Sequence, residues 1–150
     1  QLAEQGNPFR PGARELLADL RAAGVKTGLV TMSMRRMAET VVDQIPFEAF
    51  DVIVAGDDAT RPKPYPDPYL QACDALGVAA TDAVAIEDSP NGLRAAVASG
   101  AVTIGVIIHG DSYISGHGPG VTVLMSCRTP KIKAKLDPNA NLANYLNFKK

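Results

Sequence analysis

The chain has 150 residues, 46% of them hydrophobic, which suits one globular domain and excludes an intrinsically disordered chain. A formal net charge of −1 favours neither nucleic acid nor a membrane as partner. Two cysteines are too few for a disulfide framework, no apolar run is long enough to span a membrane, and the N-terminus shows no signal-peptide pattern, so we expect a cytoplasmic protein.

The first third of the chain alternates helix and strand patterns. A leucine-rich stripe predicts a helix over residues 12–23, and residues 25–30 then form a candidate strand. Apolar residues at helical spacing predict a second helix over residues 34–45, and residues 51–55 form a short β-rich strand. The apolar stripe of the second helix consists of Met34, Met37, Ala38, Val41, Val42 and Ile45.

A polar loop over residues 56–66 leads into a third predicted helix. Asp67 suits its cap, Pro68 its first turn and Gly77 its end. We expect this helix to turn four apolar side chains inward, namely Tyr69, Leu70, Cys73 and Leu76.

The alternation continues to the end of the core. Residues 83–86 form an apolar strand, a helix ending at Gly100 follows, and strands are expected over residues 102–108 and 121–125. This fourth helix holds the apolar residues Leu93, Ala96 and Val97. Strands and helices in this order predict an α/β fold with a mostly parallel sheet covered by helices.

The end of the chain differs in composition. The glycine-rich stretch at residues 110–120 indicates a flexible loop. Residues 128–150 contain six bases and one acid, and a short helix could begin at Asp137. A solvated tail with one docked helix is the preferred interpretation, and a basic contact arm is the alternative.

Three sets of polar residues lie just past predicted strands, and we call each set a polar station. The first follows the strand that ends at residue 30. The hydroxyl of Thr31, with Ser33 close behind, stands before the second helix, where it could donate to a phosphate oxygen that the helix end also attracts. The alternative is an ordinary helix cap, which Ser33 alone could supply.

The second station is Lys63, which lies among Pro62, Pro64 and Pro66. Prolines stiffen the backbone, so this lysine is held before the third helix, where it could neutralise a phosphoryl group as a point charge. The alternative is a solvated loop lysine.

The third station is the pair Glu87 and Asp88, directly after an apolar strand. Open parallel sheets place their chemistry at the carboxyl ends of strands, and adjacent carboxylates suit Mg²⁺. The alternative is a helix cap plus a solvated acid. Together, the three stations suit phosphoryl transfer, which depends on positioning and electrostatics.

These stations resemble motifs two, three and four of the haloacid dehalogenase superfamily; they are Thr31, Lys63 and the pair Glu87-Asp88. Residues 63–69 resemble its Lys-Pro-x-Pro-Asp signature. Residues 87–92 resemble the Glu-Asp-Ser-x-x-Gly signature of the phosphatase and β-phosphoglucomutase-like branch, and residues 9–12 resemble the re-entry into the core domain. The resemblance covers roughly residues 9–125.

The resemblance implies a Rossmann-like parallel sheet with helices on both faces, and Mg²⁺-dependent hydrolysis or transfer of a small phosphorylated metabolite through an aspartyl-phosphate. The substrate-binding residues it implies are Thr31, Met32, Ser33 and Lys63. Of these, Thr31 and Lys63 would be catalytic. Glu87 and Asp88 would hold Mg²⁺.

One family feature is missing, because no Asp-x-Asp occurs in the chain. That first motif supplies the nucleophilic aspartate, and its strand is central in the family's sheet. We therefore expect residues 1–127 to form a partial core domain lacking the first strand and the cap, with residues 128–150 as a basic tail. Such a chain should be inactive alone; the alternatives are a non-catalytic phosphate- or metal-binding module and an engineered folding fragment.

The missing strand would leave a gap between the strands that end at Thr31 and at Ile86. We expect the exposed edges to recruit a second copy or a complementary N-terminal segment. The alternative is that the two strands pair directly with each other.

Overall fold

A computed structural model of the protein describes residues 9–10 and 12–105, together with the backbone of a strand at residues 123–126. The expected loop at residues 110–120 and the tail at residues 128–150, with its helix at Asp137, lie outside the described residues. Within the described part, no helix is both long and apolar enough to cross a membrane.

The predicted order of helices and strands is confirmed, with ends displaced by a few residues. In chain order the elements are α1 (Ala13–Ala22), β1 (Thr27–Val30), α2 (Arg35–Val42), β2 (Val52–Val54), α3 (Asp67–Leu76), the 3₁₀ turn η1 (Ala80–Asp82), β3 (Ala83–Glu87), α4 (Pro90–Ser99), β4 (Val102–Gly105) and β5 (Val123–Ser126). Gly77 and Gly100 end α3 and α4 with positive φ angles of 65° and 88°, a conformation that glycine adopts without strain.

The described strands form one sheet in the order β2-β1-β5-β3-β4. β1 pairs with β2 in parallel, and β3 pairs with β4 in parallel. β5 runs antiparallel to both of its neighbours, β1 and β3. The α/β sheet is therefore mostly parallel as predicted, and its central strand is the exception.

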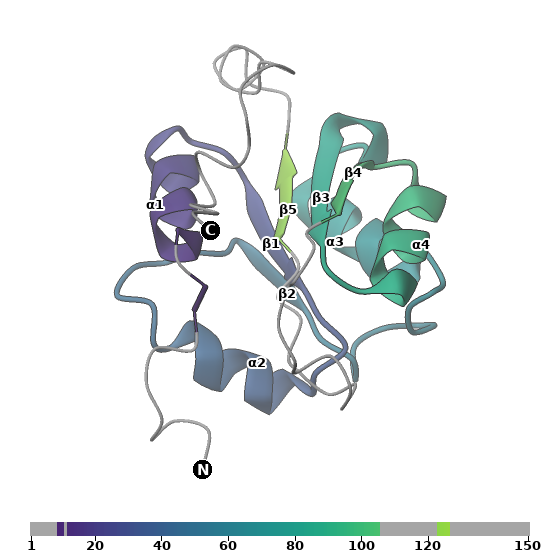
Figure 1. The fold of residues 1–150 in the computed structure, drawn as a ribbon, viewed down its shortest axis with the longest axis horizontal. Coiled ribbons are helices and arrows are strands. Elements are labelled where there is room, and N and C mark those ends of the chain that lie inside the picture. Colours follow the sequence, from purple (N-terminus) through teal and green to yellow (C-terminus); the bar gives the residue numbers. More distant parts are fainter. Residues whose placement is uncertain (1–8, 11, 106–122, 127–150) are drawn as a thin grey trace, which may run out of the picture.

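The expectation of a gap between β1 and β3 is corrected by the position of β5. Figure 1 shows β5 between these two strands, and Leu124 lies opposite Gly28 of β1 on one side and Ala85 of β3 on the other. β1 and β3 therefore neither pair with each other nor present open edges to each other. A segment from the C-terminal part of the same chain takes the central position.

Helices cover both faces of the sheet, as predicted. Along β3, Ala83 and Ala85 pack in a core cluster with α3 and α4, whereas Val84 packs with Leu20 of α1. Alternate residues of a strand point to opposite faces, so α1 lies on one side of the sheet and α3 and α4 lie on the other (Figure 1).

Several residues of the predicted apolar stripes are exposed to solvent. These are Met34 (51%), Met37 (44%), Leu70 (40%) and Val97 (66%). In α4 the buried face consists of small side chains, including Ala95 and Ala96, which let the helix approach the sheet closely. Helical periodicity predicts an apolar stripe, but the width of the covering surface decides how much of it is buried.

Asp51 joins the end of α1 to the start of β1. Its carboxylate accepts a hydrogen bond of 2.8 Å from the backbone N–H of Thr27 and forms a 2.7 Å ion pair with Arg21. Burial alone would raise the pKa of Asp51, but the Thr27 N–H and the Arg21 guanidinium together hold it below its usual range.

We expect Asp51→Asn to lower the stability of the protein at neutral pH and to have less effect in acid. A carboxyl whose pKa is depressed in the folded state contributes stability above its unfolded pKa, near 4, and that contribution is lost as the pH falls through the folded pKa. Urea denaturation from pH 7 down to pH 3 measures the difference. The control is Asp19→Asn, an exposed position. A stability difference that stays constant across this range would contradict the prediction.

Candidate functional site

The loop before α3 is held by Arg61. Its guanidinium makes two hydrogen bonds of 2.9 Å to the carboxylate of Asp67 and stacks over the ring of Tyr65, 4.6 Å from the centroid. The N-cap of α3 is Pro66, so Asp67 lies in the first turn rather than capping the helix as predicted. The Arg61 contacts fix the path of the chain on both sides of Pro64, which follows a cis peptide bond.

Lys63 is turned inward from this loop, and only 6% of its side chain is exposed. Its ammonium group donates a 3.1 Å hydrogen bond to the carbonyl of Val30, the last residue of β1. It also forms an ion pair with Glu87, the last residue of β3, and lies 4.9 Å from the centroid of the Tyr69 ring. Burial lowers the pKa of Lys63, and the attraction of Glu87 acts against this.

Glu87 is among the most buried charged groups of the described residues, with a relative exposure of 2%. Besides the Lys63 ammonium, its Oε1 accepts a 2.6 Å hydrogen bond from the hydroxyl of Tyr69. Its Oε2 accepts from the backbone N–H groups of Asp88 and Ser89 and from the Ser89 hydroxyl, at 3.2–3.3 Å. The carboxylate therefore faces inward, away from solvent.

Tyr69 is a residue that the sequence interpretation assigned only to the core. It is fully buried, yet its hydroxyl lies against Glu87. The sequence did contain a sign of this contact, because the hydroxyl of a tyrosine in a core position usually has a hydrogen-bond partner.

The turn after β1 brings Thr31, Met32 and Ser33 to the same end of the sheet. Thr31 is buried, its N–H bonds to Val54, and its hydroxyl accepts a 3.1 Å hydrogen bond from the N–H of Ser33. Ser33 does not cap α2, whose N-cap is Met34. The alternative interpretation of Ser33 as a helix cap is therefore wrong.

Asp88 follows Glu87 but is oriented differently. It is half-buried, and its carboxylate has no hydrogen bond or ion pair with another described residue. Burial and the neighbouring charge of Glu87 raise the pKa of Asp88, against the smaller effects of Lys63 and Arg10. A carboxylate in this position can accept a cation.

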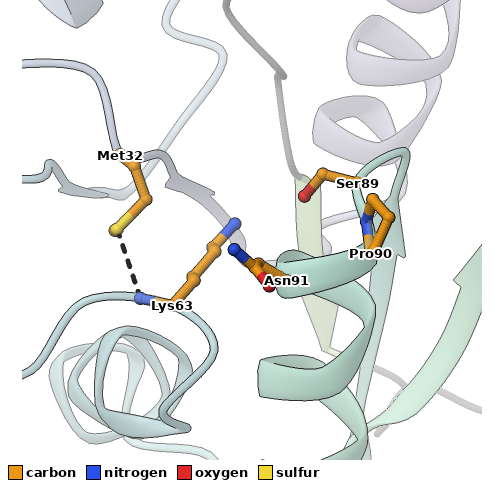
Figure 2. A pocket seen from close by; sticks show the side chains of 5 residues that line it. All are labelled: Met32, Lys63, Ser89, Pro90 and Asn91. Carbon is orange, nitrogen blue, oxygen red and sulfur yellow. Dashed lines mark hydrogen bonds between the residues drawn. The ribbon is translucent and has the colours of Figure 1, made fainter. Parts of the chain in front are cut away.

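A cavity of about 470 Å³ opens beside Lys63. The described residues that line it are Met32, Lys63, Ser89, Pro90 and Asn91. In Figure 2 the Lys63 side chain extends from its loop, where its N–H contacts the sulfur of Met32, toward Asn91 in the first turn of α4.

Some of the predicted site residues line the cavity and others do not. Lys63 and Met32 line it, whereas Thr31, Ser33 and Asp88 are not among the described lining residues. Asn91 was missed as a site residue, although it belongs to the Glu-Asp-Ser-x-x-Gly signature. No group of three or more metal-ligating side chains occurs within the described ranges.

Comparison with protein families gives two matches. The family model described as haloacid dehalogenase-like hydrolase matches residues 1–100. A second model, the C-terminal part of a domain of unknown function (DUF4438), matches residues 72–146 and carries no description of an activity.

Curated relatives include several phosphatases. The chain is 38% identical over 96 residues to validoxylamine A 7'-phosphate phosphatase of Streptomyces hygroscopicus subsp. limoneus, and 31% identical over 114 residues to phosphoglycolate phosphatase of Escherichia coli. The matches cover 63% and 75% of this chain but 45% of each relative. The chain thus spans less than half the length of the curated relatives it matches.

Solved structures agree with this relationship. A structure of CbbY from Rhodobacter sphaeroides in complex with xylulose-(1,5)bisphosphate is 36% identical, with a TM-score of 0.66, and the match covers 72% of this chain and 50% of that one. A putative β-phosphoglucomutase from Thermotoga maritima is 31% identical, with a TM-score of 0.62 and coverage of 73% and 52%.

Proposed function

Because the chain belongs to the haloacid dehalogenase-like hydrolase family, we propose that its cavity receives the phosphoryl group of a small phosphate ester. The observation that carries this proposal is Lys63, which lines the cavity and whose ammonium group is fixed at the ends of β1 and β3. A fixed cation in a mostly buried position attracts phosphate more strongly than a solvated one.

We propose the remaining roles from the resemblance of these residues to the motifs of the family. The turn formed by Thr31, Met32 and Ser33 would bind the phosphoryl oxygens, and Lys63 would offset their charge. Asp88 would hold Mg²⁺, because its carboxylate has no partner among the described residues and Mg²⁺ binds through one or two carboxylates while keeping several waters. Magnesium, when bound, would offset negative charge on the phosphoryl group.

The substrate class is proposed from the relatives. Their names and titles include a phosphorylated validoxylamine, phosphoglycolate and a xylulose bisphosphate. These molecules share a phosphate group on a small hydroxylated organic compound. We propose a substrate of this class for the phosphatase or phosphomutase reaction of which this chain forms part.

The catalytic nucleophile is not part of the proposal for these 150 residues. The family's Asp-x-Asp motif does not occur in the sequence. Covalent catalysis divides one difficult step into two easier ones, and in this proposal the group that would form the covalent intermediate is not among these 150 residues. In this proposal the chain binds phosphate and Mg²⁺ but does not turn over a phosphate ester alone. The alternative interpretation of the chain as a non-catalytic phosphate- or metal-binding module makes the same prediction.

We expect the purified chain to bind inorganic phosphate saturably and to release none from p-nitrophenyl phosphate with Mg²⁺. Calorimetry measures the binding and absorbance measures the turnover. The control is the double variant Lys63→Met/Glu87→Gln, which removes both charges of the buried pair and should abolish phosphate binding. Arg36→Met, at an exposed position of α2, should leave it unchanged. If the wild-type chain hydrolysed p-nitrophenyl phosphate and Asp88→Asn did not, the proposal that these 150 residues lack the nucleophile would be contradicted.

A further inference from the structure

We propose that Glu87 is a positioning residue that fixes the ammonium group of Lys63 beside the cavity, with Tyr69 as its support, and that Glu87 does not ligate magnesium. This inference deepens the proposed function and rests on it for the role of Lys63. It gives Glu87 a different task from its neighbour Asp88, although the two carboxylates are adjacent in the sequence.

The first argument is the number of donors around the carboxylate. Five donors of the described residues surround its two oxygens: the Lys63 ammonium, the Tyr69 hydroxyl, two backbone N–H groups and the Ser89 hydroxyl. An ionised carboxylate offers about four lone-pair sites. No acceptor site is therefore left for a metal ion in this orientation.

The second argument is the space reserved for the carboxylate by Gly92. A Cβ atom at Gly92 would overlap the carboxylate carbon and both oxygens of Glu87. The N–H of Gly92 donates a 3.0 Å hydrogen bond to the Ser89 hydroxyl, which in turn donates to Glu87. The first turn of α4 is thus shaped around a carboxylate that points inward.

The third argument concerns what would follow if Glu87 turned toward a metal beside Asp88. Such a rotation would remove the charge partner of Lys63, whose side chain is 6% exposed, and the partner of the fully buried Tyr69 hydroxyl. Removing one partner of a buried ion pair is strongly unfavourable, because it leaves an uncompensated charge. The inward orientation keeps the Lys63 ammonium fixed between Val30 and the Tyr69 ring.

The test compares Tyr69→Phe with Tyr65→Phe, a matched loss of one hydroxyl from an exposed ring. Lysine labelled with ¹³C reports on Lys63, whose signals are identified by their loss in Lys63→Met/Glu87→Gln. A fixed lysine gives two separate Hε resonances, which merge when the side chain rotates freely. Phosphate and Mg²⁺ affinities are measured by calorimetry on the same proteins.

We expect Tyr69→Phe to bring the two Hε resonances of Lys63 together and to weaken phosphate binding roughly tenfold, as the loss of an orienting partner does at other sites. Its Mg²⁺ affinity should stay within about twofold of the wild type, because this change leaves Asp88 in place. Tyr65→Phe should change none of these quantities. A Tyr69→Phe protein with unaltered Hε resonances would overturn the proposal.

The part of the proposal that concerns magnesium is tested by comparing the Glu87→Gln and Asp88→Asn variants. Glu87→Gln should merge the Lys63 resonances and keep Mg²⁺ affinity within about twofold, whereas Asp88→Asn should lower it at least tenfold. An equal loss of Mg²⁺ binding in the two variants would overturn the proposal. A wild-type chain that binds no phosphate would contradict the proposed function, and the Hε resonances of Tyr69→Phe would still decide the role of Glu87.

Discussion

A chain with proline in place of Leu124 is expected to lose cooperative folding. Leu124 lies in the middle of β5, opposite Gly28 on one side and Ala85 on the other, so both edges of this strand are hydrogen-bonded. Proline has no N–H to donate, and it is excluded from central strands for that reason. A buried carbonyl left without its donor costs about 1–3 kcal/mol, and displacement of β5 would also expose β1 and β3.

The measurements are circular dichroism during thermal unfolding and light scattering over a range of concentrations. Leu124→Pro should show a broad or absent transition and should associate, because two strand edges become available. Leu124→Val is the control, since it keeps the backbone N–H and a residue that favours strands. A monomeric Leu124→Pro protein with a wild-type transition would show that β5 is dispensable for the sheet.

The position of β5 shows what the sequence pattern could not predict. The apolar run at residues 121–125 indicated a strand, and the structure confirms one at Val123–Ser126. An apolar run has the same pattern whichever way the strand runs. It therefore predicts neither the antiparallel orientation of β5 nor which strands lie beside it. Those depend on long-range pairing, which here places the last described strand between β1 and β3.

The proximity of two candidate site residues was predicted where strand ends decided the geometry. Lys63 and Glu87 were expected at one edge of the sheet, and they form a buried ion pair there. The orientation of Glu87 was also present in the pattern, because it is two residues from Ala85 and so shares the face of β3 that packs against α3 and α4. Asp88 lies just beyond the end of β3, so this argument about faces applies to Glu87 and not to Asp88.

Tyr69 could not be assigned from periodicity alone. Its position in the apolar stripe of α3 predicted burial, which the structure confirms. The contact of its hydroxyl with Glu87 joins residues 18 positions apart and depends on how α3 packs over β3. Helical periodicity describes one element at a time, so it cannot show which polar group on another element receives the hydroxyl.

Replacing Lys63 with methionine is expected to destabilise the protein by about 3–5 kcal/mol, the usual cost of breaking a buried ion pair by removing one partner. The aliphatic part of the side chain is kept, but the carboxylate of Glu87, whose side chain is 1% exposed, loses its counter-charge. Because folded domains are stable by only about 5–15 kcal/mol, this change is a large fraction of the total. Urea denaturation at pH 7 measures it.

The double variant Lys63→Met/Glu87→Gln should recover much of that stability. Glutamine keeps a carbonyl oxygen for the Tyr69 hydroxyl and carries no charge, so the buried site becomes neutral again. The two single variants and the double variant form a double-mutant cycle, and residues in direct contact should give a coupling energy of about 0.5–3 kcal/mol. Additive effects would contradict a direct pair. A double variant that folds well but binds no phosphate would separate the ligand-binding role of the pair from its contribution to stability.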